Sequence, residues 1–405
     1  MRKALFWMHL VVGVAAGLVI ALMAATGTLM AFRSEITLWA EHDVRHVPVP
    51  VPAARMQIRD LADAVREARP DGRANQITVS RDPSAAVVFS VGRDDQLFVN
   101  PYTGEVTLGN HPALGAFFET VEGLHRWIGL TGRMKQVGCS ITAACCALYL
   151  LLLLSGLFLW WPKKSDMKAF AAAVRLRFDR KGKARDWNWH TTVGFWVSPL
   201  LLLTTVTGLV MAYPWLADRL YKRPGKDQAA QVQPAGAQPK PAAHPLSTDA
   251  ILVKVEAAYP DWDSIGMRTG GRRAGGAPGP GTGAAPIQPK VEQRGQGGVR
   301  PPLSLTLRDK KGWLALPVQL NVDPYTGDIS VSENPSTDPF AKILRISAKA
   351  FHTGEALGLP GAFLMAISGL ASLALVATGL SLAIRRLLAW NSRQGRSTGN
   401  EPGRN

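Results

Sequence analysis

The stretch LFWMHLVVGVAAGLVIALMAATGTLMAF, residues 5–32, contains no Asp, Glu, Lys or Arg. Three further runs share this property, and they are residues 136–161, 191–213 and 361–384. A helix of about 20 apolar residues crosses the roughly 30 Å of hydrocarbon in a bilayer. The sequence therefore predicts an α-helical membrane protein with four transmembrane helices. The first run is too long for the core of a signal peptide, so we expect it to be a retained anchor.

Basic residues flank these helices unevenly. Residues 162–186 hold nine Lys and Arg against three Asp, the tail from Arg385 adds five Arg, and Arg2 and Lys3 precede the first helix. The positive-inside rule places these three pieces, and thus both termini, in the cytoplasm. Topology and anionic lipid account for much of the net charge of +16. We therefore expect a lipid membrane, and no nucleic acid, as partner.

The two long external loops repeat one pattern. Residues 58–69 have helical spacing, and alternating strands follow at 76–80, 85–91, 96–100 and 105–109. In the second loop a helix is expected at 247–262, capped by Ser247 or Thr248, with strands at 303–307, 316–322 and 329–331. The motifs NPYTGEV and DPYTGDI suit tight turns. We expect two α+β modules, each with a helix on a small antiparallel sheet.

The predicted organisation is two helix–module–helix repeats. Two stretches rich in Gly and Pro, about 268–300 and 222–245, are expected to be disordered or to act as spacers. The predicted segments are helix 1 (1–32), module 1 (33–120), a His segment with helix 2 (121–161), a basic cytoplasmic loop (162–187), helix 3 (188–213), module 2 (214–350), a His segment with helix 4 (351–386) and a cytoplasmic tail (387–405).

An internal repeat relates the two halves. A shift of 181 residues places His9 on His190 and the stretch TGTLMAF on TGLVMAY. A shift of 223 residues places Pro101–Gly104 on Pro324–Gly327 and the stretch SGL on TGL in the second and fourth helices. The two halves therefore have the same construction, with a longer external loop in the second half.

Each predicted membrane helix has one histidine in it or just before it. His9 and His190 lie near the cytoplasmic ends of helices 1 and 3. His125 in GLHRWIGLTG and His352 in FHTGEALGLPG precede helices 2 and 4 on the external side, and a four-residue gap is needed to align them. Haem iron accepts axial imidazoles, and bundle cores commonly hold such cofactors. We expect one haem between His9 and His190 and a second between His125 and His352.

Four glycines accompany these histidines. Gly13 and Gly194 each follow a histidine by four residues, about 40° around the helix. Gly27 and Gly208 follow by eighteen residues, on the same face about 27 Å away. Their lack of side chains would leave room for the two macrocycles. The alternative is that the histidines only hydrogen-bond between helices and the glycines only permit close packing.

The remaining histidines and the cysteines carry weaker signals. His42 and His46 have the i, i+4 spacing of metal ligands, but an exposed pair of this kind is more often simply solvated. His111 and His244 precede prolines and receive no role. The three cysteines, Cys139, Cys145 and Cys146, form no C-x-x-C-H motif, so any haem is b-type.

The chain resembles a known family at several motifs. NPYTGEV, DPYTGDI, LHRWIGL, FHTGEALGLPG and a last helix ending in TGLSLAIRR are similar to those of the PepSY-associated transmembrane-helix family. The family includes iron-regulated inner-membrane proteins of Gram-negative bacteria that reduce ferric siderophores in the periplasm with b-type haem. The resemblance implies two PepSY-like periplasmic modules, strengthens His125 and His352 as haem ligands, and supplies the substrate class. The basic insert departs from the family pattern.

The predicted function is therefore electron transfer across the inner membrane through two b-type haems. A cytoplasmic or quinol donor would supply electrons, and a ferric siderophore would be reduced to release Fe(II) for iron uptake. Arg126 and Trp127 are the candidates for substrate contact, with interfacial anchoring as the alternative. Two other functions stay open, a transporter and a PepSY-type anchored sensor or inhibitor without haem.

Overall fold

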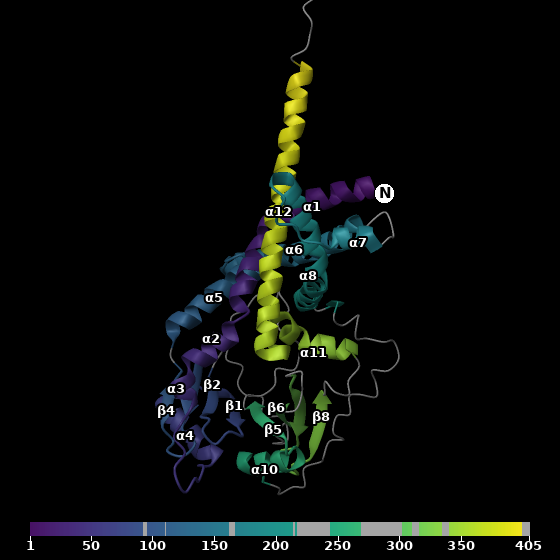
Figure 1. Cartoon of the computed structure of the whole chain (residues 1–405). Coiled ribbons are helices and arrows are strands. Elements are labelled where there is room, and N and C mark those ends of the chain that lie inside the picture. Colours follow the sequence, from purple (N-terminus) through teal and green to yellow (C-terminus); the bar gives the residue numbers. More distant parts are fainter. Residues whose placement is uncertain are drawn as a thin grey trace, which may run out of the picture. The chain divides into compact units, whose positions relative to one another are not determined.

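The computed structural model describes residues 1–91, 95–109, 111–161, 167–213, 215–216, 244–268, 302–309, 316–333 and 340–398. The chain forms two compact units (Figure 1). We call them the helical unit, residues 1–33, 116–217 and 348–405, and the sheet unit, residues 34–115 and 218–347. The predicted Gly- and Pro-rich insert, except Arg268, and most of the predicted spacer before it lie outside the described residues.

Long apolar helices build the helical unit. Four helices in the described part of the chain are long and apolar enough to cross a membrane, as the hydropathy pattern predicts. They are α1 (Arg2–Met30), α6 (Lys135–Trp160), α8 (Gly182–Ala212) and α12 (Gly358–Thr398). Helix α8 begins at Gly182 rather than at residue 188, so part of the predicted basic loop is its first turns.

The four long helices form a bundle in which α1 and α8 each pack between α6 and α12 (Figure 1). The two helices of each half are thus neighbours, and the halves contact each other through α6 with α8 and through α1 with α12. Near the centre of the bundle Tyr149 of α6 and Ser372 of α12 are joined by a hydrogen bond of 2.8 Å. These residues occupy equivalent positions under the 223-residue shift. Two halves of similar sequence therefore meet across an internal approximate two-fold axis.

Shorter helices lead into the second and fourth spans. Helix α5 (Pro112–Trp127) precedes a 3₁₀ turn, η1 (Gly132–Met134), and α6. Helix α11 (Phe340–Thr353) precedes η2 (Glu355–Leu357) and α12. Gly354 at the second corner has φ of +86°, and an added Cβ would lie against the backbone of Gly361. Only glycine permits both the left-handed backbone and this close approach.

The sheet unit contains one eight-stranded antiparallel sheet in the order β4-β3-β2-β1-β5-β6-β7-β8. Each half contributes a four-stranded meander. The first half supplies β1 (Ala74–Ser80), β2 (Val87–Val91), β3 (Asp95–Val99) and β4 (Val106–Leu108). The second half supplies β5 (Trp262–Arg268), β6 (Leu303–Asp309), β7 (Val318–Val322) and β8 (Ile329–Glu333).

The two small sheets expected from the sequence are halves of one larger sheet, because β1 and β5 pair along their length. Ile77 pairs with Met267 and Val79 with Ile265, so the two meanders share one hydrogen-bond ladder. The sequence does not predict β5, and the stretch expected to be disordered begins at its last residue, Arg268. Each meander alone would expose the edge of its first strand, and the pairing removes both edges.

Two helices cover the sheet. Helices α4 (Ile58–Ala68) and α10 (Thr248–Ala258) bury Leu61 and Val255 in a single core with strands of both meanders. Ser247 caps α10 by accepting from the amide of Ala250, which confirms one of the two predicted caps. The predicted turns are also present. Gly104 and Gly327 both have φ of +74°, a conformation that glycine adopts without strain.

The shared ladder predicts that the two meanders unfold together. Ile265 is fully buried on β5, so Ile265→Ala should cost about 2–4 kcal/mol of the free energy of unfolding. Hydrogen–deuterium exchange of the full chain should then accelerate in β2 as well as in β7. Val331→Ala, at a half-exposed position of β8, is the matched control and should change little. Acceleration confined to the second meander would show two independent modules.

Candidate functional site

Four histidines of the helical unit come together as two pairs. We call His9 and His190 pair 1, and His125 and His352 pair 2. The ring centres lie 6.3 Å apart in pair 1 and 6.2 Å apart in pair 2. His9 and His190 are on α1 and α8, whereas His125 and His352 are on α5 and α11. The structure therefore brings together the pairs that the sequence predicts.

The two pairs lie near opposite ends of the bundle. On α1, His9 belongs to pair 1, and Gly27, eighteen residues later, contacts His125 of pair 2. Eighteen residues of α-helix rise about 27 Å. Pair 1 lies at the end where α1 and α8 begin, and where Arg2 donates to the carbonyl oxygen of Trp161 after α6. Most of the basic residues that flank the four spans lie at this end.

In pair 2, each imidazole is held through Nδ1 by a neighbouring membrane helix. His125 Nδ1 lies 2.9 Å from the carbonyl oxygen of Met23 and 3.1 Å from Oγ1 of Thr26, on α1. His352 Nδ1 lies 2.9 Å from the carbonyl oxygen of Thr204 and 3.2 Å from Oγ1 of Thr207, on α8. The two environments are equivalent in the two halves.

Pair 1 uses the same arrangement on the other two helices. His190 Nδ1 lies 3.1 Å from both the carbonyl oxygen of Leu375 and Oγ1 of Thr378, on α12. His9 Nδ1 lies 2.9 Å from Oγ of Ser155 on α6. All four partner hydroxyls belong to a Ser-Gly or Thr-Gly dipeptide. The repeat pattern contained these dipeptides, but sequence reasoning gave the hydroxyl residues no role.

The hydrogen-bond pattern decides the tautomer of the histidines. Each partner hydroxyl donates its proton to the carbonyl four residues earlier, over 2.6–2.7 Å. The hydroxyl oxygens and backbone carbonyls therefore accept, and each Nδ1 carries the proton that is donated. Nε2 of each histidine is then unprotonated and has a free lone pair. This is the state in which a histidine binds a metal, with its other nitrogen held by an outer partner.

The glycine after each hydroxyl residue leaves space for an imidazole. A Cβ added at Gly27 or Gly208 would lie 3.3 or 3.2 Å from Cε1 of His125 or His352. The same holds in pair 1, where Gly156 faces His9 at 3.3 Å and Gly379 faces His190 at 3.2 Å. We call Gly27, Gly156, Gly208 and Gly379 the contact glycines. They let each ring lie directly against the backbone of the helix that binds its Nδ1.

Gly13 and Gly194, predicted as space for a macrocycle, have other neighbours. An added Cβ would lie 3.8 Å from Leu152 at Gly13 and 3.5 Å from Leu375 at Gly194. No imidazole is among the contacts of either position within 4 Å. The structure thus places them at helix–helix contacts near pair 1, and their role beside a cofactor stays a prediction.

Burial keeps both histidines of pair 2 neutral. Burial, followed by the effect of charge on the neighbouring His352, lowers the pKa of His125 to about 4. Burial also lowers the pKa of His352, although its bond to Thr204 acts in the opposite direction. Near pH 7 both imidazoles are therefore uncharged. Each can offer a nitrogen lone pair to a metal without first losing a proton.

The geometry of each pair suits two ligands on one metal ion. Two imidazoles that bind an ion from opposite sides, each with a metal–nitrogen distance of about 2 Å, have ring centres roughly 6 to 6.5 Å apart. A bare ion usually requires three or four protein ligands. No group of three or more His, Cys, Asp or Glu side chains suited to a metal ion occurs among the described residues. Two donors alone suit a haem, whose macrocycle supplies the other ligands.

A cavity extends from pair 2 towards the middle of the bundle. It is lined by residues from all four long helices and by both histidines of the pair. Gly27, Ala24 and Gly369 contribute little bulk to its walls, and Tyr149 and Ser372 lie at its lining as well. The bundle therefore leaves space directly beside the two imidazoles of pair 2.

The residues predicted to touch substrate already have protein partners. Arg126 donates to Glu122 over 2.8 Å, and its guanidinium lies 5.3 Å from the ring centre of Trp127. Nζ of Lys135 lies 3.9 Å from the same ring. Glu122 also accepts from Arg33 over 2.9 Å. These contacts explain the positions of Arg126 and Trp127, and substrate contact stays a prediction.

Other sequence signals are placed apart from the pairs. His42 and His46 stack on each other in the sheet unit, with ring centres 4.3 Å apart. The structure also shows a buried carboxylate that sequence reasoning missed, Asp186 in the first turns of α8. Asp186 accepts from Ser381 over 2.7 Å and from Arg185 over 2.9 Å. In the first half, Leu5 of α1 occupies the position equivalent to Asp186. Leucine has no carboxylate, so it cannot link α1 to α6 as Asp186 links α8 to α12.

Comparison with known families agrees with this architecture. The family model for the PepSY-associated TM region matches residues 6–386. The chain belongs to this family. It is a multi-pass membrane protein with PepSY-associated helices, as the motifs around His125 and His352 predict. No curated protein matches the chain.

Proposed function

We propose that this PepSY-associated membrane protein is a di-haem reductase of the bacterial inner membrane. Pair 1 holds one b-type haem and pair 2 holds a second. The chain passes electrons from a cytoplasmic or quinol donor across the membrane to a ferric siderophore in the periplasm. The observation that carries the proposal is the fourfold arrangement in which a neutral histidine bonds through Nδ1 to a Ser/Thr-Gly dipeptide. Simple interhelical bonding would not require two unprotonated Nε2 atoms at each end, on imidazoles whose ring centres lie only 6.2–6.3 Å apart.

The chain's own residues set the properties of each site. The four histidines would hold the haem irons through Nε2, and their hydroxyl and carbonyl partners fix the orientation of each ring. The low-dielectric surroundings of the bundle exclude water from the iron. A bound haem supplies one-electron chemistry by cycling its iron between the ferric and ferrous states. Catalytic acids and bases are then not needed.

Charge supports the proposed direction of transfer. Basic residues cluster where α1 and α8 begin and where α6 and α12 end, which favours a cytoplasmic location for pair 1. Pair 2 is then on the periplasmic side. Both termini are cytoplasmic in this arrangement. Electrons enter at pair 1 and leave from pair 2.

The chemistry of iron explains the release step. Siderophores bind Fe(III) through hard oxygen donors, and the softer Fe(II) binds such donors less tightly. Reduction of the chelated iron by one electron therefore weakens the complex and frees Fe(II). The substrate is the ferric chelate, and the siderophore leaves unchanged.

The haem content of the full chain tests the proposal. Detergent-purified protein, expressed with ample haem, should show a Soret band and two haems per chain by the pyridine-haemochrome assay. After reduction with dithionite and removal of the excess, a ferric siderophore should reoxidise the protein, and a ferrous-specific chelator should trap the Fe(II) formed. Protein without haem would overturn the proposal and favour a PepSY-type anchored binding protein.

A further inference from the structure

A single buried charge lies beside pair 1. Among the residues whose burial the structure describes, Asp186 is the only buried Asp, Glu, Lys or Arg, with 4% of its side chain exposed. Asp186 is on α8, four residues before His190, and residues four apart lie on the same face of a helix. Its carboxylate is therefore about one helical turn from a proposed haem ligand and is shielded from water.

Asp186 belongs to the contact between α8 and α12 that holds His190. Oδ2 of Asp186 accepts a hydrogen bond of 2.7 Å from Oγ of Ser381 on α12. Three residues earlier on α12, Oγ1 of Thr378 lies 3.1 Å from Nδ1 of His190. The carboxylate and the imidazole thus make successive contacts with the same helix. A change of charge at Asp186 therefore acts on pair 1 through protein rather than through solvent.

Three neighbours hold Asp186 in its ionised form. Oδ1 accepts from Nε and Nη2 of Arg185 over 3.1 and 2.9 Å, and Nε of Arg385 lies 3.7 Å from Oδ2. Together with the hydroxyl of Ser381, these groups favour the charged carboxylate. The two arginine side chains are 50% and 48% exposed, so water and salt screen their charges. The buried negative charge is screened less, and its field at the nearby pair is stronger.

The first half of the chain builds the same helix contact without any charge. The repeat places apolar residues at the positions equivalent to Arg185, Asp186 and Ser381, and they are Ala4, Leu5 and Phe158. Helices α1 and α6 nevertheless pack together, and Ser155 of α6 still holds Nδ1 of His9 at 2.9 Å. The fold therefore does not need a carboxylate at this position in order to hold a histidine.

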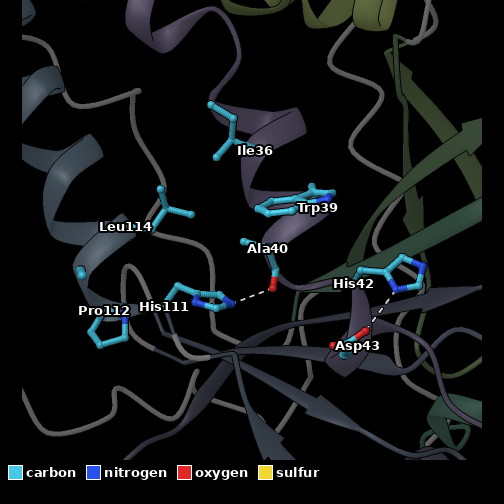
Figure 2. A pocket seen from close by; sticks show the side chains of 9 residues that line it. Ile36, Trp39, Ala40, His42, Asp43, His111, Pro112 and Leu114 are labelled. Atoms are coloured by element: carbon cyan, nitrogen blue, oxygen red, sulfur yellow. Dashed lines mark hydrogen bonds and ion pairs between the residues drawn. The ribbon is translucent and has the colours of Figure 1, made fainter.

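Other carboxylates near a histidine are in contact with water. Glu122 lies three residues before His125 of pair 2, but 31% of its side chain is exposed. Figure 2 shows Asp43 of the sheet unit beside His42, 3.4 Å from its Nδ1, and this carboxylate is fully exposed. Of these three acids, Asp186 alone has a charge that the protein shields from solvent. The two pairs thus differ in the buried charge beside them.

We propose that Asp186 lowers the reduction potential of the haem at pair 1 relative to that at pair 2. A buried negative charge disfavours an added electron on a nearby iron. One electron then leaves the ferrous iron at pair 1, which becomes ferric, and reduces the ferric iron at pair 2 to ferrous. Asp186 thus favours transfer from pair 1 to pair 2. The inference rests on the proposed reductase function and adds the residue that biases its direction.

Redox titration of the detergent-purified full chain, followed by its optical spectrum, tests the proposal without any turnover. Asp186→Asn removes the charge and keeps an oxygen that accepts from Ser381. It should favour reduction of the haem at pair 1 about tenfold, which raises its midpoint potential by about 59 mV. The midpoint at pair 2 should change by less than about twofold in the same terms. The two waves are assigned by repeating each titration with His125→Ala, which leaves pair 1 intact.

Arg385→Gln tests the sign of the effect. It leaves the carboxylate less compensated, so the same haem should become harder to reduce by about two- to threefold. A purely structural role would give both variants the same direction, because each loosens the contact between α8 and α12. The side chain of Arg385 is half-exposed, so this variant keeps the test open even if Asp186→Asn does not fold.

Two control variants separate charge from contact. Ser381→Ala removes the hydrogen bond and keeps the charge, and Asp179→Asn removes an exposed charge just before α8. Both should leave the midpoint at pair 1 within about twofold of the parent. An unmoved midpoint in Asp186→Asn, an equal shift at both haems, or a shift of the same sign in Arg385→Gln would overturn the inference.

Haem is counted in every sample, so the two proposals fail in different ways. A parent chain without haem would overturn the reductase proposal and this inference together. Two haems per chain with midpoints that neither variant changes would overturn this inference alone.

Discussion

Replacing either histidine of a pair by alanine is expected to halve the haem content of the purified chain. His125→Ala or His352→Ala should empty pair 2, and His9→Ala or His190→Ala should empty pair 1. In the proposed sites each haem would depend on two histidine nitrogens, and the loss of one removes a metal bond. No group of three or more His, Cys, Asp or Glu side chains suited to a metal ion occurs among the described residues. Any haem that remains in the altered site should be five-coordinate and high-spin.

The measurement is haem per chain by the pyridine-haemochrome assay, combined with optical and electron paramagnetic resonance spectra. His42→Ala and His111→Ala are matched controls, because both residues lie in the sheet unit, outside the two pairs. They should leave two low-spin haems. If the pair variants and the controls lose equal amounts of haem, the loss indicates general misfolding. Full haem content in all four pair variants would contradict ligation by these residues.

Substitution of a contact glycine is the second change for which we expect a large effect on haem binding. Alanine at any of them would place a Cβ 3.2–3.3 Å from an imidazole Cε1, so the ring must move by a few tenths of an ångström. Such a shift in an axial ligand should lower haem affinity about tenfold in the affected pair. Valine adds two more methyl-sized groups in the same space and should displace the ring entirely. Gly27→Val should therefore resemble His125→Ala, and Gly379→Val should resemble His190→Ala.

Gly13→Ala and Gly194→Ala are the matched controls. Their added Cβ atoms would meet leucine side chains at 3.8 and 3.5 Å, which are ordinary contacts. Haem titration of the purified apoprotein, followed by the Soret band, should give parent affinity for both. If these two variants lose haem while the contact-glycine variants keep it, the macrocycles lie against Gly13 and Gly194, as the helical wheel alone suggested.

Local pattern in the sequence determined much of this fold. Uncharged apolar runs locate the four spans, because hydrophobicity over about 20 residues decides insertion regardless of tertiary contacts. Alternation locates the strands β1 to β4, and Pro-x-x-Gly locates the turns at Gly104 and Gly327. The internal repeat also pairs His9 with His190.

Tertiary structure alone decided how these pieces combine. The pairing of Val79 with Ile265 joins strands that are far apart in the chain, and alternation within each strand says nothing about its partner. Likewise His125 bonds to Thr26, 99 residues earlier, so only packing shows which hydroxyl and which glycine serve a given imidazole. Helical periodicity orients a side chain around its own axis, and the neighbour it meets depends on how helices pack.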